Sequence, residues 1–282
     1  MTRQVPGTIA SKSSIRKGGE NMLKKKNSII DKIPNWGWLM ISLATAIVLW
    51  YFLSIGEKTS RCFPFIDKMI IAFQTVTERE ILWADIKSSM ISVLMGFAFG
   101  FLTSVPVAFL MAWYRPVRNI IEPWIQFIRN IPPLAYVPLV VLAVGIGFKA
   151  QITVICIATF LTIAVTVFQG VINVDETLIK AARVLGANDT VLFVKVIFPA
   201  TTPFIITAVR LGISVALTTL IAAESTGAVA GLGMRIKALS QVFENAEMMF
   251  YIIVVGVIGM LAEKILKFFE RRLTSWQEKR EI

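Results

Sequence analysis

Long apolar segments alternate with shorter polar ones along most of this chain. Each apolar segment holds about 18 residues or more, the length that an α-helix needs to span the hydrocarbon core of a bilayer. Backbone polar groups surrounded by lipid must be hydrogen-bonded within their own segment, so these segments are expected to be helices. The pattern predicts an all-α, polytopic membrane protein with about six transmembrane helices. They cover residues 36–55, 89–113, 124–148, 151–171, 203–223 and 248–268.

Prolines and glycines modify two of these helices. Pro132, Pro133 and Pro138 are clustered in the third helix, where each removes a backbone donor and bends or breaks the helix. The cluster is compatible with a broken helix beside a pathway through the membrane and equally with a bent packing helix. In the second helix, Gly96 and Gly100 form a small-xxx-small pair. This pair favours close packing against another helix, for example one of a second copy.

The composition agrees with this class of protein. The chain has 282 residues, of which 56% are hydrophobic and 17% are charged, and its mean hydropathy is +0.70. A soluble domain would carry about 25% charged residues. The net charge of +11 could indicate nucleic-acid binding. Basic cytoplasmic flanks of a membrane protein explain this charge better, so no nucleic acid is expected as a partner.

The distribution of charge predicts the orientation of the chain. Basic residues are concentrated before residue 33 and after residue 262. Under the positive-inside rule both termini are expected in the cytoplasm, which agrees with an even number of spans. The connection at 115–118 and the loop at 173–200 then lie inside as well. The outer connections are residues 56–88, 149–150 and 225–247.

The chain is expected to have three parts. Residues 1–33 form a basic cytoplasmic arm whose low apolar content predicts disorder. Residues 34–270 form the transmembrane domain, and residues 271–282 form a cytoplasmic tail. Residues 17–22 can be back-translated into a ribosome-binding sequence followed by a start codon. Translation is therefore expected to begin at Met22, which the intact mass of the native protein would test.

Few residues of this chain carry reactive chemistry. Histidine, the commonest general base and metal ligand, is absent. Cys62 is expected outside and Cys156 within a helix, so they form no bridge, and no metal-ligand spacing occurs. Neither a G-x-x-x-x-G-K-[ST] phosphate loop nor a G-x-S-x-G motif is present. The chain is therefore not expected to be an enzyme, and any ATP that drives it must be bound by another chain.

A polar segment at about 173–202, between the fourth and fifth predicted helices, has a helical pattern of its own. Asp175 or Thr177 can cap a helix that runs to about Ala187. Gly186 can supply the sharp turn that ends this helix. The segment is thus expected to be more than a simple connection between two membrane helices.

The two faces of this short helix differ. Leu178, Ala182 and Leu185 share one face, whereas Lys180 and Arg183 share another. A helix of this kind can lay its apolar face in the groove of a partner, with basic residues at the rim. It can alternatively lie on the lipid surface.

The spacing of residues in this segment resembles the cytoplasmic E-A-A loop of the membrane subunits of ABC importers. In that family the pattern is E-A-A-x3-G-x9-I-x-L-P, and here Lys180 replaces the glutamate. The corresponding positions here are Lys180, Ala181, Ala182, Gly186, Val196, Phe198 and Pro199, of which both alanines, the glycine and the proline are identical to the pattern. The resemblance implies that the helix docks in a cleft of an ATPase subunit and carries its closure to the membrane helices. The residues expected to couple to the ATPase are Lys180, Ala181, Ala182, Arg183, Leu185, Gly186, Ala187 and Pro199.

The resemblance extends over roughly residues 35–277. Further segments are similar to the nitrate, sulfonate and taurine branch of these permeases, nearest to taurine permeases. They are residues 128–139, 207–212, 220–224, 230–233 and 269–276. The branch implies a small anionic solute, such as taurine or another sulfonate, nitrate or bicarbonate.

The resemblance also implies partners. One chain offers one coupling helix and an importer core needs two, so a second permease copy, in a homodimer, is expected. Two ATP-binding subunits would bind ATP and Mg at the cytoplasmic face, and this chain would bind no cofactor. A solute-binding protein would deliver the solute outside, and lipid would surround the helices in a bacterial or archaeal cell (inner) membrane.

Charged side chains inside membrane helices are the candidates for the pathway, because their burial in lipid is costly unless they face a cavity or a partner. Arg129, Arg210 and Glu224 meet this criterion. An anionic solute would favour the two arginines. The alternative is that the arginines snorkel to the interface or satisfy helix ends. For Glu224 the favoured interpretation is a structural hydrogen-bonding partner near residues 231–233.

Two other classes of protein stay open. A secondary transporter without an ATPase would need coupling-ion sites, and Glu224 is the main acidic residue within the spans. A membrane-embedded enzyme would need a constellation of a nucleophile and a base or of metal ligands, which the sequence does not offer.

Overall fold

The computed structural model describes residues 34–56 and 59–273 of the chain. The predicted basic arm, the proposed start at Met22 and the end of the tail lie outside the described residues. The chain divides into two units, residues 1–60 and 61–282. In the first unit, helix α2 (Asn35–Ile55) follows Pro34 and ends at Gly56. This helix confirms the first predicted span at its predicted position.

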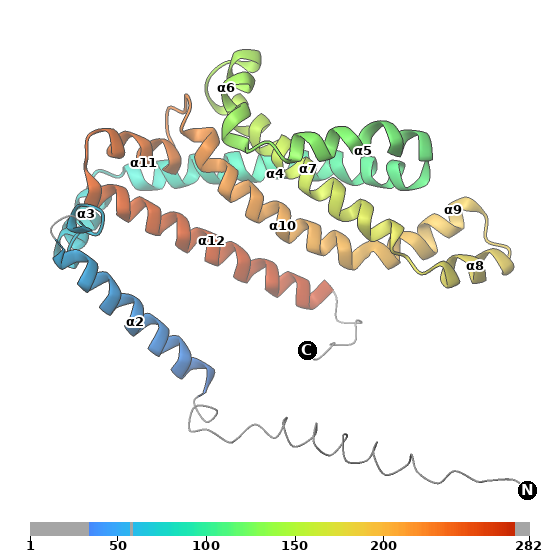
Figure 1. The fold of residues 1–282 in the computed structure, drawn as a ribbon, viewed down its shortest axis with the longest axis horizontal. Helices are drawn as coiled ribbons and strands as arrows, with labels where there is room; N and C mark the ends of the chain where they lie inside the picture. The colour runs from blue at the N-terminus through green and yellow to red at the C-terminus, as the bar shows by residue number, and fades with distance from the viewer. Residues whose placement is uncertain (1–33, 57–58, 274–282) are drawn as a thin grey trace, which may run out of the picture. The chain divides into compact units, whose positions relative to one another are not determined.

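The second unit is built around helix α7 (Phe148–Ile172), which packs between α4 (Ile81–Trp113) and α10 (Phe198–Glu224) (Figure 1). More than half of the most apolar window of α7 is buried. Val154, Ile155 and Ile163 on this helix have no exposed surface. The central position of α7 explains why its sequence is apolar on every side.

Gly96 and Gly100 of α4 face α7 within the same chain. A Cβ atom at Gly96 would lie 2.7 Å from the side chain of Ile155, and one at Gly100 would collide with Thr159. The small-xxx-small pair therefore permits close approach of two helices of one chain. The expectation of packing against a second copy is not needed to explain it.

The third predicted helix, at 124–148, is not one continuous span. It is replaced by α5 (Arg115–Arg129) and α6 (Pro133–Val144), which are bent by 108° at the break. Pro132 and Pro133 cannot donate the backbone hydrogen bonds that would carry α5 into α6. Of the two interpretations of the proline cluster, the structure shows the break, while its position beside a pathway stays a prediction.

Other predicted boundaries also shift. Helix α4 begins at Ile81 rather than at 89, and its early polar residue Asp85 is buried and bonded to Gly231, Arg235 and Tyr251. In place of a span at 203–223, an apolar helical stretch runs from Asp189 to Glu224. It comprises α9 (Asp189–Leu192), the π-helix η3 (Phe193–Ile197) and α10.

Short helices occupy the connections. They are η2 (Thr59–Arg61), α3 (Ile66–Glu78), α8 (Glu176–Val184) and α11 (Leu232–Gln241). The last helix is α12 (Asn245–Leu273), longer than the predicted 248–268. The described residues contain no strand, so the predicted all-α class is confirmed.

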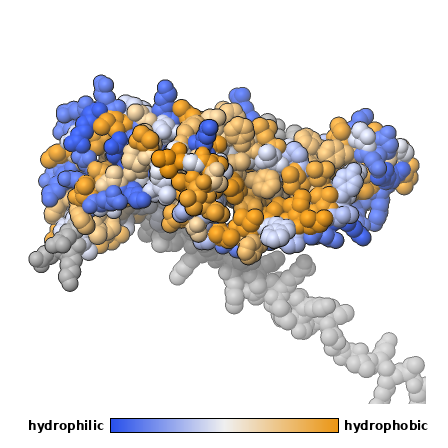
Figure 2. All heavy atoms as spheres, turned by 90° about the horizontal axis from the view of Figure 1, so that it is seen from above, coloured by the Kyte–Doolittle hydropathy of each residue, from blue (hydrophilic) through white to orange (hydrophobic). Residues whose placement is uncertain are grey.

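By length and composition the described helices provide 5 membrane spans, or up to 6 if the bent pair α5 and α6 counts as one. On the face drawn in Figure 2, hydrophobic side chains occupy the middle and hydrophilic ones gather toward both ends. Helices that cross a bilayer have this distribution, because their ends reach the headgroups and water.

Candidate functional site

Helix α8 is the predicted coupling helix, and its two ends are built as the sequence indicates. The carboxylate of Asp175 accepts a hydrogen bond of 2.8 Å from the backbone amide of Thr177, so Asp175 is the N-cap. The helix ends at Val184, three residues before the predicted Ala187. Gly186 has φ +82°, the left-handed conformation that glycine adopts without strain.

An ion pair lies on the exposed side of α8. The ammonium of Lys180 is 2.8 Å from the carboxylate of Glu176, at the i, i+4 spacing. This pair raises the pKa of Lys180 and lowers the pKa of Glu176. The amide of Thr177 lowers the pKa of Asp175 as well. The cap is lost only as pH falls through that lowered pKa, so the cap and both charges of the pair persist at neutral pH.

The apolar side chains of α8 divide differently from the prediction. Ala182 packs inward, with Ile179, against the core of the second unit. Val184 and Leu185 are 88% and 87% exposed at the end of the helix, and Leu178 is also exposed. Val184 and Leu185 are adjacent, so the end of the helix presents two exposed apolar side chains together. Val184 was not among the residues expected to couple to the ATPase.

The neighbouring segments connect α8 to the membrane helices. Arg183 of α8 forms an ion pair with Asp189, the first residue of α9. Asn188 caps α9 by accepting from the amide of Val191 at 2.8 Å. The π-helix η3 follows, a form that occurs mostly as single turns and often at functional sites.

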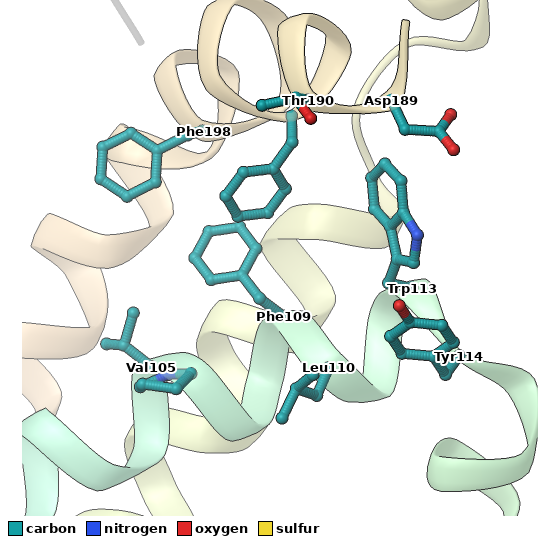
Figure 3. A pocket seen from close by; sticks show the side chains of 10 residues that line it. Val105, Phe109, Leu110, Trp113, Tyr114, Asp189, Thr190 and Phe198 are labelled. Atoms are coloured by element: carbon teal, nitrogen blue, oxygen red, sulfur yellow. The ribbon is translucent and has the colours of Figure 1, made fainter.

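An aromatic cluster joins this segment to α4 (Figure 3). Phe109 of α4 lies edge-to-face with Phe193 at 5.1 Å between ring centroids and stacks on Phe198 at 5.9 Å. Trp113 packs edge-to-face on Phe193 at 5.9 Å. A groove of about 610 Å³ lies beside these rings, between α4 and the α9–η3–α10 stretch. The segment that follows α8 is therefore in direct ring contact with α4.

A buried polar cluster lies at the other end of α10. Asp85 and Ser89 of α4 and Glu224 of α10 have no exposed surface. The hydroxyl of Ser89 donates to Glu224 Oε1 at 2.6 Å, and the amide of Gly233 donates to Glu224 Oε2 at 2.7 Å. Glu224 is thus a hydrogen-bonding partner at residues 231–233, as its favoured interpretation expects. Full burial sets it away from an open pathway, and a pathway role for it stays a prediction.

The two candidate arginines lie apart from this cluster. Arg210, partly exposed on α10, forms an ion pair with Glu270 of α12, while its buried Nε has no hydrogen-bond partner within the described part of the chain. Arg129 is exposed in the last turn of α5, beside the 108° break. It does not begin a third span as predicted. The structure does not bring Arg129, Arg210 and Glu224 together into one site.

Known proteins are similar to this chain in sequence and in fold. A model of the family "binding-protein-dependent transport system inner membrane component" matches residues 104–275. A probable ABC transporter permease protein of Brucella abortus (strain 2308) is 40% identical over 248 residues, 88% of this chain and 98% of that protein. The taurine transport system permease protein of Escherichia coli (strain K12) is 34% identical over 195 residues, 69% of this chain and 71% of that protein.

A solved structure has the same arrangement of helices. It is the inward-facing MetNI methionine ABC transporter, with a TM-score of 0.61 over 70% of this chain and 96% of that chain. The sequence identity is 19%, so this likeness shows the fold. The chain belongs to the family of binding-protein-dependent transport system inner membrane components. Its place there is that of the permease, the membrane-spanning subunit of an ABC importer.

Proposed function

We propose that this permease works as a homodimer that forms the translocation pathway between two ATP-binding subunits inside and a solute-binding protein outside. The observation that carries the proposal is α8, a capped helix whose exposed apolar end, Val184 and Leu185, is flanked by basic residues. One chain supplies one such helix, so two copies would supply the pair that two ATPase subunits require.

The proposed mechanism is alternating access. Closure of the ATPase subunits on ATP pulls the two α8 helices together. Arg183 moves α9 through its pair with Asp189, and the rings of Phe193 and Phe198 press on Phe109. The cavity then opens outward to receive solute, and hydrolysis returns it to the inward-facing state.

ATP and Mg would be bound by the ATPase partners, and this chain would bind no cofactor. The described residues hold no cluster of three or more histidine, cysteine, aspartate or glutamate side chains that could bind a metal. Both termini and α8 would lie in the cytoplasm and α11 outside, in the inner membrane of the cell. The excess of basic residues near the termini supports this orientation.

The proposed solute is small and carries a negatively charged group, with taurine or another sulfonate preferred over nitrate and bicarbonate. The resemblance to the taurine permease of Escherichia coli supports this choice. Arg129 and Arg210 are proposed to contribute positive charge near the pathway, and Glu224 stays a predicted pathway residue. Secondary transport without an ATPase is the rival function, and it would leave the exposed end of α8 without a role.

Co-purification in mild detergent tests the proposal. The tagged permease should retain a P-loop ATPase in equal amount. Substitutions Val184→Glu and Leu185→Glu, which place charge on the apolar end of α8, should remove most of it. Val242→Glu and Phe243→Glu are matched controls, because these residues are also exposed but follow α11 at the other end of α10. An intact complex that contains no ATPase, while a control importer keeps its own, would favour the secondary transporter.

A further inference from the structure

Helix α11 is attached to the membrane helices through its own N-terminus. Three consecutive backbone amides there donate to buried side chains of α4 and α10. The amide of Gly231 donates to Asp85 Oδ1 at 3.0 Å and that of Leu232 to Ser89 Oγ at 2.9 Å, while Gly233 is bonded to Glu224. These amides have no acceptor within the helix, and carboxylates at a helix N-terminus also interact favourably with the positive end of its dipole.

Two more side chains complete this cluster. The guanidinium of Arg235, one turn into α11, donates to Asp85 from Nε at 2.9 Å and from Nη2 at 3.4 Å. The hydroxyl of Tyr251 on α12 donates to the same carboxylate at 3.3 Å. Asp85 and Glu224 therefore join α4, α10, α11 and α12 at one point.

The turn between α10 and α11 is rich in glycine, and its backbone would be free to bend if this cluster did not hold α11. Gly227 and Gly231 have φ +92° and +139°, so the turn contains the residues with the most backbone freedom. A Cβ atom at Gly231 would overlap the carboxylate of Glu224, and one at Gly233 would lie 2.9 Å from the Cα of Ile221. The glycines thus allow α11 to sit directly on the end of α10, and the carboxylates hold it there.

The free energy needed to bury two carboxylates indicates that the cluster has a role beyond packing. Buried carboxylates cost several kcal/mol unless they are paired and hydrogen-bonded. Asp85 is paired with Arg235, but Glu224 has only neutral donors among the described residues. Apolar residues would attach a helix of 10 residues more cheaply. Hydrogen bonds add a fixed direction, which apolar contacts lack.

We propose that Asp85 and Glu224 are positioning residues that lock α11 to α10 as one rigid unit, so that α10 moves with α11 when a binding protein contacts the outer end of the permease. The inference rests on the proposed function, because it places α11 on the outer side and takes the binding protein as the partner. Ser89 acts with them, since its one hydroxyl accepts from α11 and donates to Glu224.

The test uses the complete transporter in liposomes, with its ATPase subunits and solute-loaded binding protein. ATP hydrolysis is measured with and without the binding protein, and the ratio of the two rates is compared. Glu224→Ala and Ser89→Ala should each reduce the stimulation ratio at least about threefold, because each removes a buried bond to α11. Glu224→Gln keeps an acceptor for Gly233 and should restore part of the ratio.

Ser92→Ala is the matched control. Ser92 is as buried as Ser89 on the same helix, but its hydroxyl donates to Gln151 of α7 at 2.7 Å rather than bonding to α11. Its stimulation ratio should equal that of the unmodified protein. Hydrogen exchange at residues 231–235 should become about tenfold faster in Glu224→Ala and Ser89→Ala, and it should be unchanged in Ser92→Ala.

The possible results separate the inference from the proposed function. If Ser89→Ala and Glu224→Ala keep the stimulation ratio of Ser92→Ala, the positioning role is wrong and the importer stands. A proportional fall of both rates at a constant ratio would show a merely structural role and would also overturn the inference. If the unmodified complex shows no stimulation by any loaded binding protein, the proposed function fails together with the inference.

Discussion

At the scale of the residue, Lys180 is the departure from the E-A-A pattern that the structure explains. Its ammonium pairs with Glu176, one turn earlier on α8, whereas a glutamate at 180 would face that carboxylate at the i, i+4 spacing. The pair is fully exposed, and its energetic contribution is correspondingly small. The basic residue therefore suits the local sequence of this helix.

This pair predicts that the glutamate of the family pattern, placed at position 180, would weaken the association with the ATPase. Lys180→Glu should weaken co-purification of the ATPase by no more than about threefold, because like charges then face each other on α8. Exchange of the two residues, Glu176→Lys with Lys180→Glu, should recover the association. The ATPase retained per permease measures both effects at low salt. Stronger association of the single variant would show that the partner contributes a cation there.

At the scale of the element, the contact between α10 and α12 has two possible meanings. Arg210 and Glu270 form an ion pair between these helices, and a small cavity of about 90 Å³ adjoins them. The pair can hold the two helices together. Alternatively, Arg210 can attract an anionic solute while Glu270 holds the guanidinium of Arg210 in place. A pair that acts only structurally tolerates exchange of its charges, whereas a solute site does not.

Exchange of these charges distinguishes the two meanings. Arg210→Gln alone should lower solute uptake at least about tenfold, because it leaves Glu270 without this cation. In Arg210→Glu combined with Glu270→Arg the ion pair is restored. We expect that variant to regain thermal stability in detergent but not uptake, since the positive charge has moved to α12. Recovery of uptake in the exchanged protein would instead assign Arg210 a structural role only.

At the scale of the whole molecule, the sequence predicted best those features that depend on residues within a single helix. Residues 36–55 form a span because their length and hydropathy suffice, and Asp175 and Gly186 bound α8 through local hydrogen bonds. The bond from Arg235 to Asp85 joins residues 150 positions apart, so no local pattern indicates it.

The missed elements have the same explanation. Helices α3 and α11 lie in segments that were predicted to be outer loops. They were not predicted because short amphipathic helices gain most of their stability from tertiary packing, which a local sequence pattern does not show. The break between α5 and α6 was open from sequence alone, since prolines bend as well as break helices in membranes.

The homodimer is the prediction that belongs to this scale. When two copies of the permease that carry different affinity tags are expressed together with the ATPase, capture through either tag should also recover copies that carry the other tag. The reason is that each assembly with two ATPase subunits needs two α8 helices, and one chain supplies one. Recovery of only the tag that was captured would contradict the dimer, and recovery of a second, different permease would indicate a heterodimer.

The π turn at Phe193–Ile197 has a consequence for the evolution of this chain. A π turn holds about one residue more than an α turn, so it takes up an inserted residue without rotating the helix on either side. Without it, each added residue would turn α9 by about 100° relative to α10 and would move the following aromatic rings off Phe109. At this turn a single residue can therefore be inserted or deleted, while the flanking helices keep the faces that they present to their neighbours.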